Sequence, residues 1–390
     1  MSWSPPVDDS VLDDRDALEL LDESAMLRAI ATSGAQVRQA LVDIEEQVLA
    51  PLVEDGRPRA VVVTGMGGSG IVADVTAAVA GRTCPVPVVA HRGHRLPGWV
   101  GPMDLVVAVS CSGETEETLA ALDEALRRGA RVVAVGAAGS TLATRAVEGR
   151  ALHLAVDAQG RMPRANLWGL ATPVLLVADA LGLADVPRPV LEQVADALDS
   201  DAERCGPGSD SYENPAKQVA MQLAGSLPYV WGSSEVASVA AARCAAQLAE
   251  NAKYPAVHGP LTEVHHNQVV VMAGRFGELA AEDDEEIFRD RVTEDPEGSR
   301  VPRMRVLLLR DTEEVPEVAR RREATVGLAE RYDVPVEELA AVGEHPVARL
   351  ASLVAPLDFA SAYLGLLQGI DPSPIGPIVA LKATRHEEQR

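Results

Sequence analysis

The chain has 390 residues, of which 47% are hydrophobic and 24% are charged, the balance of a soluble globular protein with one or two packed cores. Its formal net charge of −23, with no Lys- or Arg-rich stretch to offset it, argues against nucleic acid as a partner. No apolar run is long enough to cross a membrane, and the first residues lack the pattern of a secretion signal. The four cysteines lie far apart, so we expect no disulfide framework and a cytoplasmic location.

The first part of the chain, residues 1–52, is acidic and carries the apolar spacing of amphipathic helices at residues 17–21 and 37–48. Nothing in it resembles a basic DNA-reading helix-turn-helix. We expect a helical cap that packs on the first domain.

The next part of the chain alternates apolar strands with helices. Strands are predicted at residues 60–64, 86–89, 104–110, 131–136 and 152–156, and helices at residues 71–80, 115–128 and 166–181. This alternation is typical of a parallel sheet covered by helices on both faces. We therefore assign a first α/β domain to residues 53–187.

A second and weaker series of the same kind follows a break in the pattern. The break lies between residues 186 and 214, which are rich in Pro, Gly, Ser and Asp, and we expect the inter-domain region there. Strands are then predicted at residues 227–231 and 303–309, each followed by a helix. Because a strand–Gly–Ser–helix unit occurs in both halves, we expect two copies of one fold. The second domain would be residues 188–390, with an acidic insertion near 278–300 and C-terminal helices.

Two predicted strand ends carry groups that suit a phosphate, and ligands of such sheets bind at this edge. The first is GMGGSG at residues 65–70, where glycines let the backbone approach a ligand and helix N-terminal amides attract an anion. The second is SCSGETEET at residues 110–118, with hydroxyls at Ser110, Ser112 and Thr115. Helix capping is the alternative interpretation of these hydroxyls. Together the two loops predict a cradle that binds phosphate through hydroxyls and amides.

A third group of polar residues follows the first helix of the second half. Glu250 begins the sequence ENAK at residues 250–253, and two adjacent histidines occur in LTEVHHN at residues 261–267. Adjacent histidines do not present both rings to one ion, and no further close pair of ligands completes a site, so we expect no metal. For Glu263 and His265, a purely structural role at a helix end or an interface is the alternative.

The two loops resemble the phosphosugar-binding signature of the sugar isomerase (SIS) domain superfamily. They are most similar to those of its bifunctional phosphoglucose/phosphomannose isomerases, which usually read GMGGS and SYSGNTEET. The resemblance covers most of the chain. It implies two tandem SIS domains, each a flavodoxin-like, doubly wound parallel sheet. It also implies that the phosphate of a hexose phosphate substrate is held by Gly67, Gly68, Ser69, Ser110, Ser112 and Thr115.

The same resemblance implies the residues that carry the chemistry. Glu250 matches the base that moves a proton between C1 and C2, and His266 matches a histidine that the neighbouring subunit supplies for ring opening. Lys382 matches the active-site lysine of the family, and Arg164 matches the arginine that stabilises the enediolate. A carboxylate and an imidazole are suited to these proton transfers. For Arg164 and Lys382, the alternative interpretation is that each is an ordinary surface charge without a catalytic role. The implied protein is a homodimer with shared active sites.

The implied activity is the isomerisation of hexose 6-phosphates through a cis-enediol, without a metal or an organic cofactor. Glu114 and Cys111 replace the usual asparagine and tyrosine of the second loop, and the Glu114 charge could repel a phosphate. The threonine by which relatives accept mannose phosphate falls at Ser373 or, in a gapless match, at Ile375. Two alternatives remain open: a non-catalytic phosphosugar-binding regulator, and an isomerase or synthase for another phosphosugar.

Overall fold

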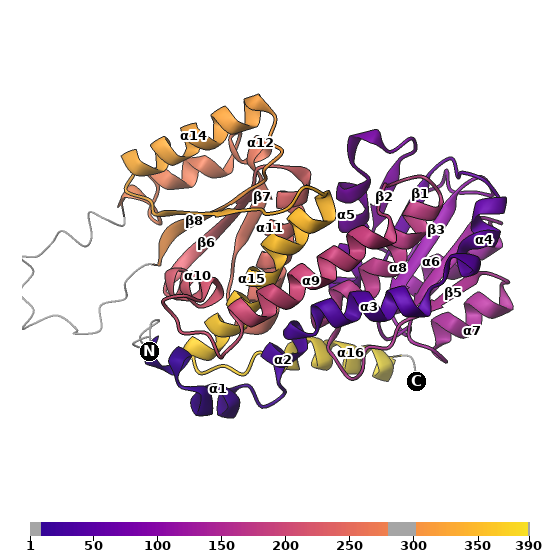
Figure 1. Ribbon diagram of the computed structural model, residues 1–390, viewed down its shortest axis with the longest axis horizontal. Helices are drawn as coiled ribbons and strands as arrows, with labels where there is room; N and C mark the ends of the chain where they lie inside the picture. Colours follow the sequence, from indigo (N-terminus) through magenta and orange to yellow (C-terminus); the bar gives the residue numbers. More distant parts are fainter. Residues whose placement is uncertain (1–8, 280–301, 389–390) are drawn as a thin grey trace, which may run out of the picture.

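The computed structural model describes residues 9–279 and 302–388 (Figure 1). The acidic insertion predicted near residues 278–300 therefore lies almost wholly outside the described residues. Within them, two parallel sheets are flanked by helices, one sheet in each half of the chain.

The first sheet has the strand order β2-β1-β3-β4-β5, and every neighbouring pair is parallel. Its strands are β1 (Val61–Thr64), β2 (Val88–His91), β3 (Leu105–Ser110), β4 (Arg131–Gly136) and β5 (Leu152–Ala155). Its helices are α5 (Gly67–Ala80), α6 (Glu116–Arg127), α7 (Thr141–Glu148) and α8 (Leu167–Ala180), with the short η2 (Gly81–Thr83) after α5. This is the flavodoxin-like order that the resemblance implied, and it reverses direction between β1 and β3.

The second sheet repeats the pattern with the order β7-β6-β8-β9. Its strands are β6 (Ser226–Gly232), β7 (Val257–Pro260), β8 (Arg303–Arg310) and β9 (Val336–Ala340). The elements between them include α11 (Glu235–Gln247), α12 (Leu261–Val264), η5 (Gln268–Ala273) and α14 (Pro316–Arg331). In each sheet, the strand that comes first in the sequence (β1 or β6) lies between the second (β2 or β7) and the third (β3 or β8). The expectation of two copies of one fold is therefore confirmed.

Three further helices pack against one another (Figure 1). They are α9 (Arg188–Cys205), α10 (Pro215–Leu223) and α15 (Pro346–Leu367). The predicted inter-domain region thus contains a helix, because the prolines that interrupt the sequence pattern fall at the first turn of α9, where proline fits. Contrary to the expectation from the sequence, the α15 segment is long and apolar enough to cross a membrane by length and composition, but 94% of its apolar window is buried inside the protein, as in a core helix.

The N-terminal helices contact both halves of the molecule. They are η1 (Asp9–Asp13), α1 (Arg15–Leu21), α2 (Met26–Ala31), α3 (Ser33–Asp43) and α4 (Glu46–Glu54). The helices α3 and α4 pack on α8 of the first half. The helices η1 and α2 pack on α15. The last helix, α16 (Gly376–Glu388), runs along the lower edge of the molecule in Figure 1.

Candidate active site

The first glycine-rich loop lies where β1 ends and α5 begins, at the point where the strand order of the first sheet reverses. A Cβ on Gly68 would lie 2.9 Å from the backbone nitrogen of Arg164. Only glycine therefore lets the first turn of α5 approach η3 (Pro163–Ala165) this closely. The approach brings the backbone of the predicted catalytic arginine to the predicted phosphate loop.

The Ser69 hydroxyl joins the two loops. Its Oγ accepts a hydrogen bond from the Cys111 amide at 3.1 Å, and Ser112 Oγ accepts one from the Glu114 amide at 3.2 Å. A serine oxygen that accepts an amide proton still has its own O–H to donate. Both hydroxyls are thus oriented by the backbone and keep a proton with which to bind a phosphate oxygen.

Ser110 and Thr115 form the remaining part of the second loop. Ser110 Oγ accepts a hydrogen bond from the Gly113 amide at 3.0 Å and lies 3.0 Å from Thr115 Oγ1, so one of these hydroxyls donates to the other. The helix α6 starts directly after Thr115, so its first amides lie at the same edge of the sheet as those of α5. Hydroxyls and two helix N-termini together form a candidate anion site, and neither loop contains a basic residue.

The corresponding edge of the second sheet carries an internal carboxylate instead. Ser234, at the start of α11, donates a hydrogen bond to Asp311 Oδ2 at 2.6 Å, and Asp311 follows β8 directly. The other oxygen of Asp311 lies 2.8 Å from Nε of Arg349. Because this anion of the protein itself already lies at the strand ends of the second sheet, we place the candidate phosphate site in the first half.

Arg164 is buried in η3, and groups of the protein take up most of its donors. Its Nε donates to Asn251 Oδ1 at 2.6 Å, and its Nη2 donates to the carbonyl oxygens of Pro372 at 2.9 Å and Ser373 at 2.8 Å. The remaining nitrogen, Nη1, lies 3.6 Å from Glu250 Oε2. Burial lowers the pKa of Arg164, and the Glu250 carboxylate opposes this shift. The guanidinium is therefore held in one plane, with one edge toward Glu250.

Glu250 lies on η4 (Leu248–Ala252), a π-helical turn that continues α11. Such turns widen a helix by one residue and are frequent at functional sites. The Glu250 side chain is 27% exposed, so it is partly dry and still accessible to a ligand. A carboxylate in this position can accept a proton while the neighbouring guanidinium stabilises a negative charge that develops on a nearby oxygen.

Lys253 also belongs to this cluster, although the sequence predicted no catalytic or binding role for it. Its Nζ donates to the carbonyl oxygens of Glu250 at 2.8 Å, Asn251 at 3.4 Å, Asp371 at 3.3 Å and Pro372 at 3.1 Å. Burial lowers the pKa of Lys253. The ammonium ties the turn that carries Glu250 to the segment before α16. Its place in the ENAK sequence was the signal that could have identified it.

A buried polar network fixes the arginine and the π turn. Arg243 of α11 and Asp358 of α15 form an ion pair at 2.7 Å, with side chains 4% and 7% exposed. Burial raises the pKa of Asp358, and the Arg243 guanidinium opposes this shift. Arg243 also donates to the Arg164 carbonyl at 2.7 Å, and Asn251 Nδ2 donates to Ser361 Oγ at 2.8 Å. This network could not be predicted from a local sequence pattern, because its paired residues are about a hundred positions apart in the chain.

Glu114 does not face the phosphate cradle as the sequence suggested. Its Oε1 accepts a hydrogen bond from the Thr141 amide at 2.8 Å, and its Oε2 accepts one from the Thr141 hydroxyl at 2.7 Å. These hydrogen bonds lower the pKa of Glu114. The carboxylate therefore stabilises the first turn of α7, where a negative charge is favourable. The expectation that it repels the substrate is corrected.

The structure does not bring His266 and Lys382 to this cluster within one chain. His266 is exposed just after α12, and Lys382 is exposed on α16. In Figure 1, α12 lies at the top of the second half and α16 along the lower edge. The neighbouring His265 is structural, as the alternative interpretation held, because its Nε2 lies 2.7 Å from Thr325 Oγ1 of α14.

Comparison with known proteins defines the class. The SIS domain family matches residues 57–181, and the bacterial phospho-glucose isomerase C-terminal SIS domain family matches residues 212–384. The crystal structure of a hypothetical protein from Thermus thermophilus has a TM-score of 0.69 at 17% identity, over 97% of this chain and 94% of that one. The fold is therefore that of a protein with two SIS domains, as expected, although the exact domain boundaries stay a prediction.

The sequence relatives narrow this class further. A bifunctional phosphoglucose/phosphomannose isomerase from Caldicellulosiruptor bescii is 30% identical over 83% of this chain and 88% of that protein. Another from Aquifex aeolicus is 27% identical over 83% of this chain and 89% of that protein. The chain belongs to the family of bifunctional phosphoglucose/phosphomannose isomerases, which confirms the resemblance found in its loops.

Proposed function

We propose that this chain isomerises hexose 6-phosphates, converting glucose 6-phosphate, mannose 6-phosphate or both to fructose 6-phosphate. The relatives from Caldicellulosiruptor bescii and Aquifex aeolicus are named for phosphoglucose and phosphomannose isomerisation. Glucose and mannose phosphates differ only at C2, and both give the same cis-enediol when the C2 proton leaves. The two epimers carry this proton on opposite faces of C2, so one base serves both only where the enediol can present either face of C2 to it, and no metal or organic cofactor enters this scheme.

The observation that carries the proposal is the contact between Glu250 and Arg164. Glu250 Oε2 lies 3.6 Å from Arg164 Nη1, and Arg164 is in turn packed on the phosphate loop at Gly68. A base, a fixed cation and a phosphate anchor are the three parts that an aldose–ketose isomerisation needs. Glu250 would take the C2 proton of the open-chain aldose and return it to C1, while O2 loses a proton and O1 gains one. Arg164 would stabilise the negative charge on the enediolate.

We extend the proposal to a homodimer in which the two subunits share their active sites. Ring opening needs an acid–base group at the ring oxygen, and we assign it to His266 of the neighbouring subunit together with Lys382. Both side chains are exposed in the single chain. Apolar side chains of α16 beside Lys382 are exposed as well: Ile378, Val379 and Leu381. Burial of this surface against a second copy would bring polar and apolar groups of α16 into an interface.

The cytoplasm is the proposed location, with no membrane or nucleic-acid partner. The four cysteines are free, which suits a reducing compartment. The net charge of −23 disfavours binding to a nucleic-acid backbone.

A coupled assay with purified protein tests the proposed function. Fructose 6-phosphate is supplied, and glucose 6-phosphate and mannose 6-phosphate are each detected with a specific coupling enzyme, with and without a chelator. We expect at least one aldose phosphate to form and the chelator to have no effect. If the protein binds hexose phosphates but turns over none of them, the function is that of a non-catalytic phosphosugar-binding protein.

A further inference from the structure

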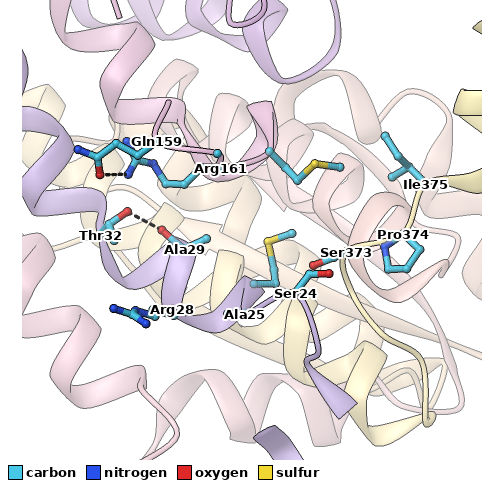
Figure 2. Close-up of a pocket in the computed structure, with 13 residues that line it drawn as sticks. Ser24, Ala25, Arg28, Ala29, Thr32, Gln159, Arg161, Ser373, Pro374 and Ile375 are labelled. Carbon is cyan, nitrogen blue, oxygen red and sulfur yellow. Dashed lines mark hydrogen bonds between the residues drawn. The ribbon is translucent and has the colours of Figure 1, made fainter. Parts of the chain in front are cut away.

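A cavity of about 610 Å³ borders the candidate active site, between the loop after β5 and the segment ahead of α16 (Figure 2). In Figure 2, Gln159 and Arg161 lie on one side of it, and Ser373 and Ile375 lie across from them. Because Ser373 and Ile375 are the positions that match the threonine by which relatives accept mannose phosphate, we assign this cavity to the candidate active site. None of its described lining residues is a histidine, so these walls do not supply the imidazole that ring opening needs.

The turn that carries His266 is short and has little stability of its own. It follows α12, which has only four residues, and it is closed by hydrogen bonds from the His266 amide to the Glu263 carbonyl at 2.9 Å and from the Asn267 amide to the Val264 carbonyl at 3.2 Å. A single helical turn is marginal by itself, because few hydrogen bonds offset the cost of ordering it. The direction of the exposed His266 side chain therefore depends on what holds the turn from outside.

Helix α14, which lies beside α12 in Figure 1, holds this turn at two points. Arg321 Nη1 donates a hydrogen bond to the Thr262 carbonyl of α12 at 3.2 Å. Just after α12, His265 Nε2 lies 2.7 Å from Oγ1 of Thr325, a residue that is only 1% exposed. The second point fixes a half-buried imidazole directly before His266.

The hydrogen bonds of Thr325 determine which nitrogen of His265 carries the proton. Thr325 Oγ1 donates its single proton to the Arg321 carbonyl at 2.9 Å, so it accepts a hydrogen bond from Nε2 of His265. Burial lowers the pKa of His265, and the charges of Arg321 and His266 act in the same direction. The His265 ring is therefore neutral at neutral pH, with its proton on Nε2, and it places no positive charge beside His266.

The far side of the same turn is anchored as well. Asn267 Nδ2 donates a hydrogen bond to Glu263 Oε1 at 2.8 Å, and Asn267 Oδ1 accepts one from the Gln268 amide at 2.6 Å. Gln268 Oε1 accepts a hydrogen bond from Nε1 of Trp231 at 2.8 Å, and Gln268 Nε2 donates one to the His258 carbonyl at 3.1 Å. Because Trp231 belongs to β6 and His258 to β7, this side of the turn is tied to the second sheet.

We propose that Thr325 and His265 are positioning residues, which hold the turn so that the His266 imidazole is presented to the active site of the neighbouring subunit. This inference rests on the proposed function, in which His266 opens the sugar ring there. Proton transfer to the ring oxygen needs an imidazole within hydrogen-bond reach, and a displacement of about 1 Å can slow such a step strongly. The phosphate is bound by the cradle of the first half, so loosening the turn should lower kcat for fructose 6-phosphate much more than it changes KM.

A double-mutant cycle tests whether Thr325 acts through His266. Thr325→Val removes the hydroxyl at nearly constant size and should lower kcat roughly tenfold with KM nearly unchanged, and His265→Phe should do the same. Thr325→Ser keeps the hydroxyl and should retain most of the wild-type kcat. In His266→Ala, whose residual turnover is measured over long incubations, Thr325→Val should cause no further loss.

The matched control for this cycle is Thr76→Val. Thr76 is a buried threonine of α5 whose hydroxyl donates to the carbonyl four residues earlier, as that of Thr325 does, so Thr76→Val removes the same kind of hydrogen bond elsewhere. It should leave kcat unchanged. An unchanged kcat in Thr325→Val, or an equal loss with and without the His266 imidazole, overturns the positioning role.

The anchoring itself is measured without activity, by amide hydrogen exchange of the full chain followed by mass spectrometry. The amides of His266 and Asn267 should exchange at least about tenfold faster in Thr325→Val than in the wild type, and at the wild-type rate in Thr325→Ser and Thr76→Val. Unchanged exchange in Thr325→Val would overturn the inference even in a fully active protein. A protein without any turnover would contradict the proposed function, and the exchange of these two amides would still decide whether Thr325 holds the turn.

Discussion

At the scale of single residues, the candidate site depends on how Arg164 is held. Its Nε and Nη2 bind three oxygens of the protein, and only Nη1 is directed toward Glu250. A guanidinium is planar and its N–H groups point in several directions, so it can donate hydrogen bonds to these three oxygens and still face Glu250. A lysine ammonium at the same position would keep the charge but would be a single point donor.

Arg164→Lys should therefore lower kcat/KM about a hundredfold, the usual effect of losing one donor that stabilises an anionic transition state. The variant keeps the positive charge, so KM for fructose 6-phosphate should change much less than kcat. Steady-state kinetics with a thermal melt as control separates this loss from unfolding. Wild-type kinetics in a folded Arg164→Lys protein would exclude Arg164 from the reaction.

Glu114 provides a second prediction at this scale. Because its carboxylate accepts two hydrogen bonds from Thr141, Glu114→Ala should destabilise the fold by about 0.5–1 kcal/mol, a typical net value for hydrogen bonds of an exposed side chain, and leave phosphosugar affinity unchanged. The lowered pKa means that the carboxylate stabilises the fold above its ordinary pKa, and that this contribution is lost as pH falls through the lowered value. Glu114→Gln, which keeps an acceptor oxygen, is the control. Tighter binding of the phosphosugar by Glu114→Ala would show that the charge does reach the cradle.

At the scale of elements, the site is made where β1 and β3 end and α5 and α6 begin. The hydroxyls of Ser69 and Ser112 are oriented by amides of the second loop and retain protons for a phosphate. Ser69→Ala/Ser112→Ala should weaken binding of fructose 6-phosphate by at least about a hundredfold, since hydrogen bonds to charged groups contribute about 1.5–3 kcal/mol each. Binding of unphosphorylated fructose should change little. Calorimetry that finds equal losses for both ligands would contradict the phosphate cradle.

The elements also show what the sequence could and could not predict. The strands of the first sheet are continuous apolar runs, so their pattern and the loops between them were readable before the structure. By contrast, β7 and β9 were not predicted, because β7 contains Gly and Pro and β9 is the half-exposed edge strand VEELA. The α9 helix was hidden by the prolines at its start.

The candidate site, like the helices and strands, could be predicted from the sequence only in part. Motif context identified Glu250 and Arg164, which the structure joins at 3.6 Å. It could not identify the Arg243–Asp358 pair, because contacts between distant parts of the chain have no local pattern. Nor could it show that Glu114 turns toward Thr141, because a substitution in a motif does not give the direction of the side chain.

At the scale of the whole molecule, the proposed reaction needs two chains. Glu250 and Arg164 lie together in one chain, while no hydrogen bond or ion pair joins the exposed His266 to either of them among the described residues. Mixing inactive Glu250→Gln and His266→Ala chains under exchange should restore about a quarter of wild-type activity, because half of the dimers are then mixed and each has one intact site. Differently tagged chains show whether mixed dimers form. Mixed dimers without activity would rule out a shared site.

The central claim is that Glu250 moves the proton between C1 and C2, and isotope exchange tests it most directly. Wild-type protein and Glu250→Gln are incubated with fructose 6-phosphate in heavy water, and deuterium at C1 of the ketose and C2 of the aldose is measured by mass spectrometry. We predict exchange by the wild type and a loss on the order of a thousandfold in the variant, with substrate affinity nearly unchanged, as for a group that acts in the transition state. Near-normal exchange by Glu250→Gln would contradict the account, since another residue would then be the base.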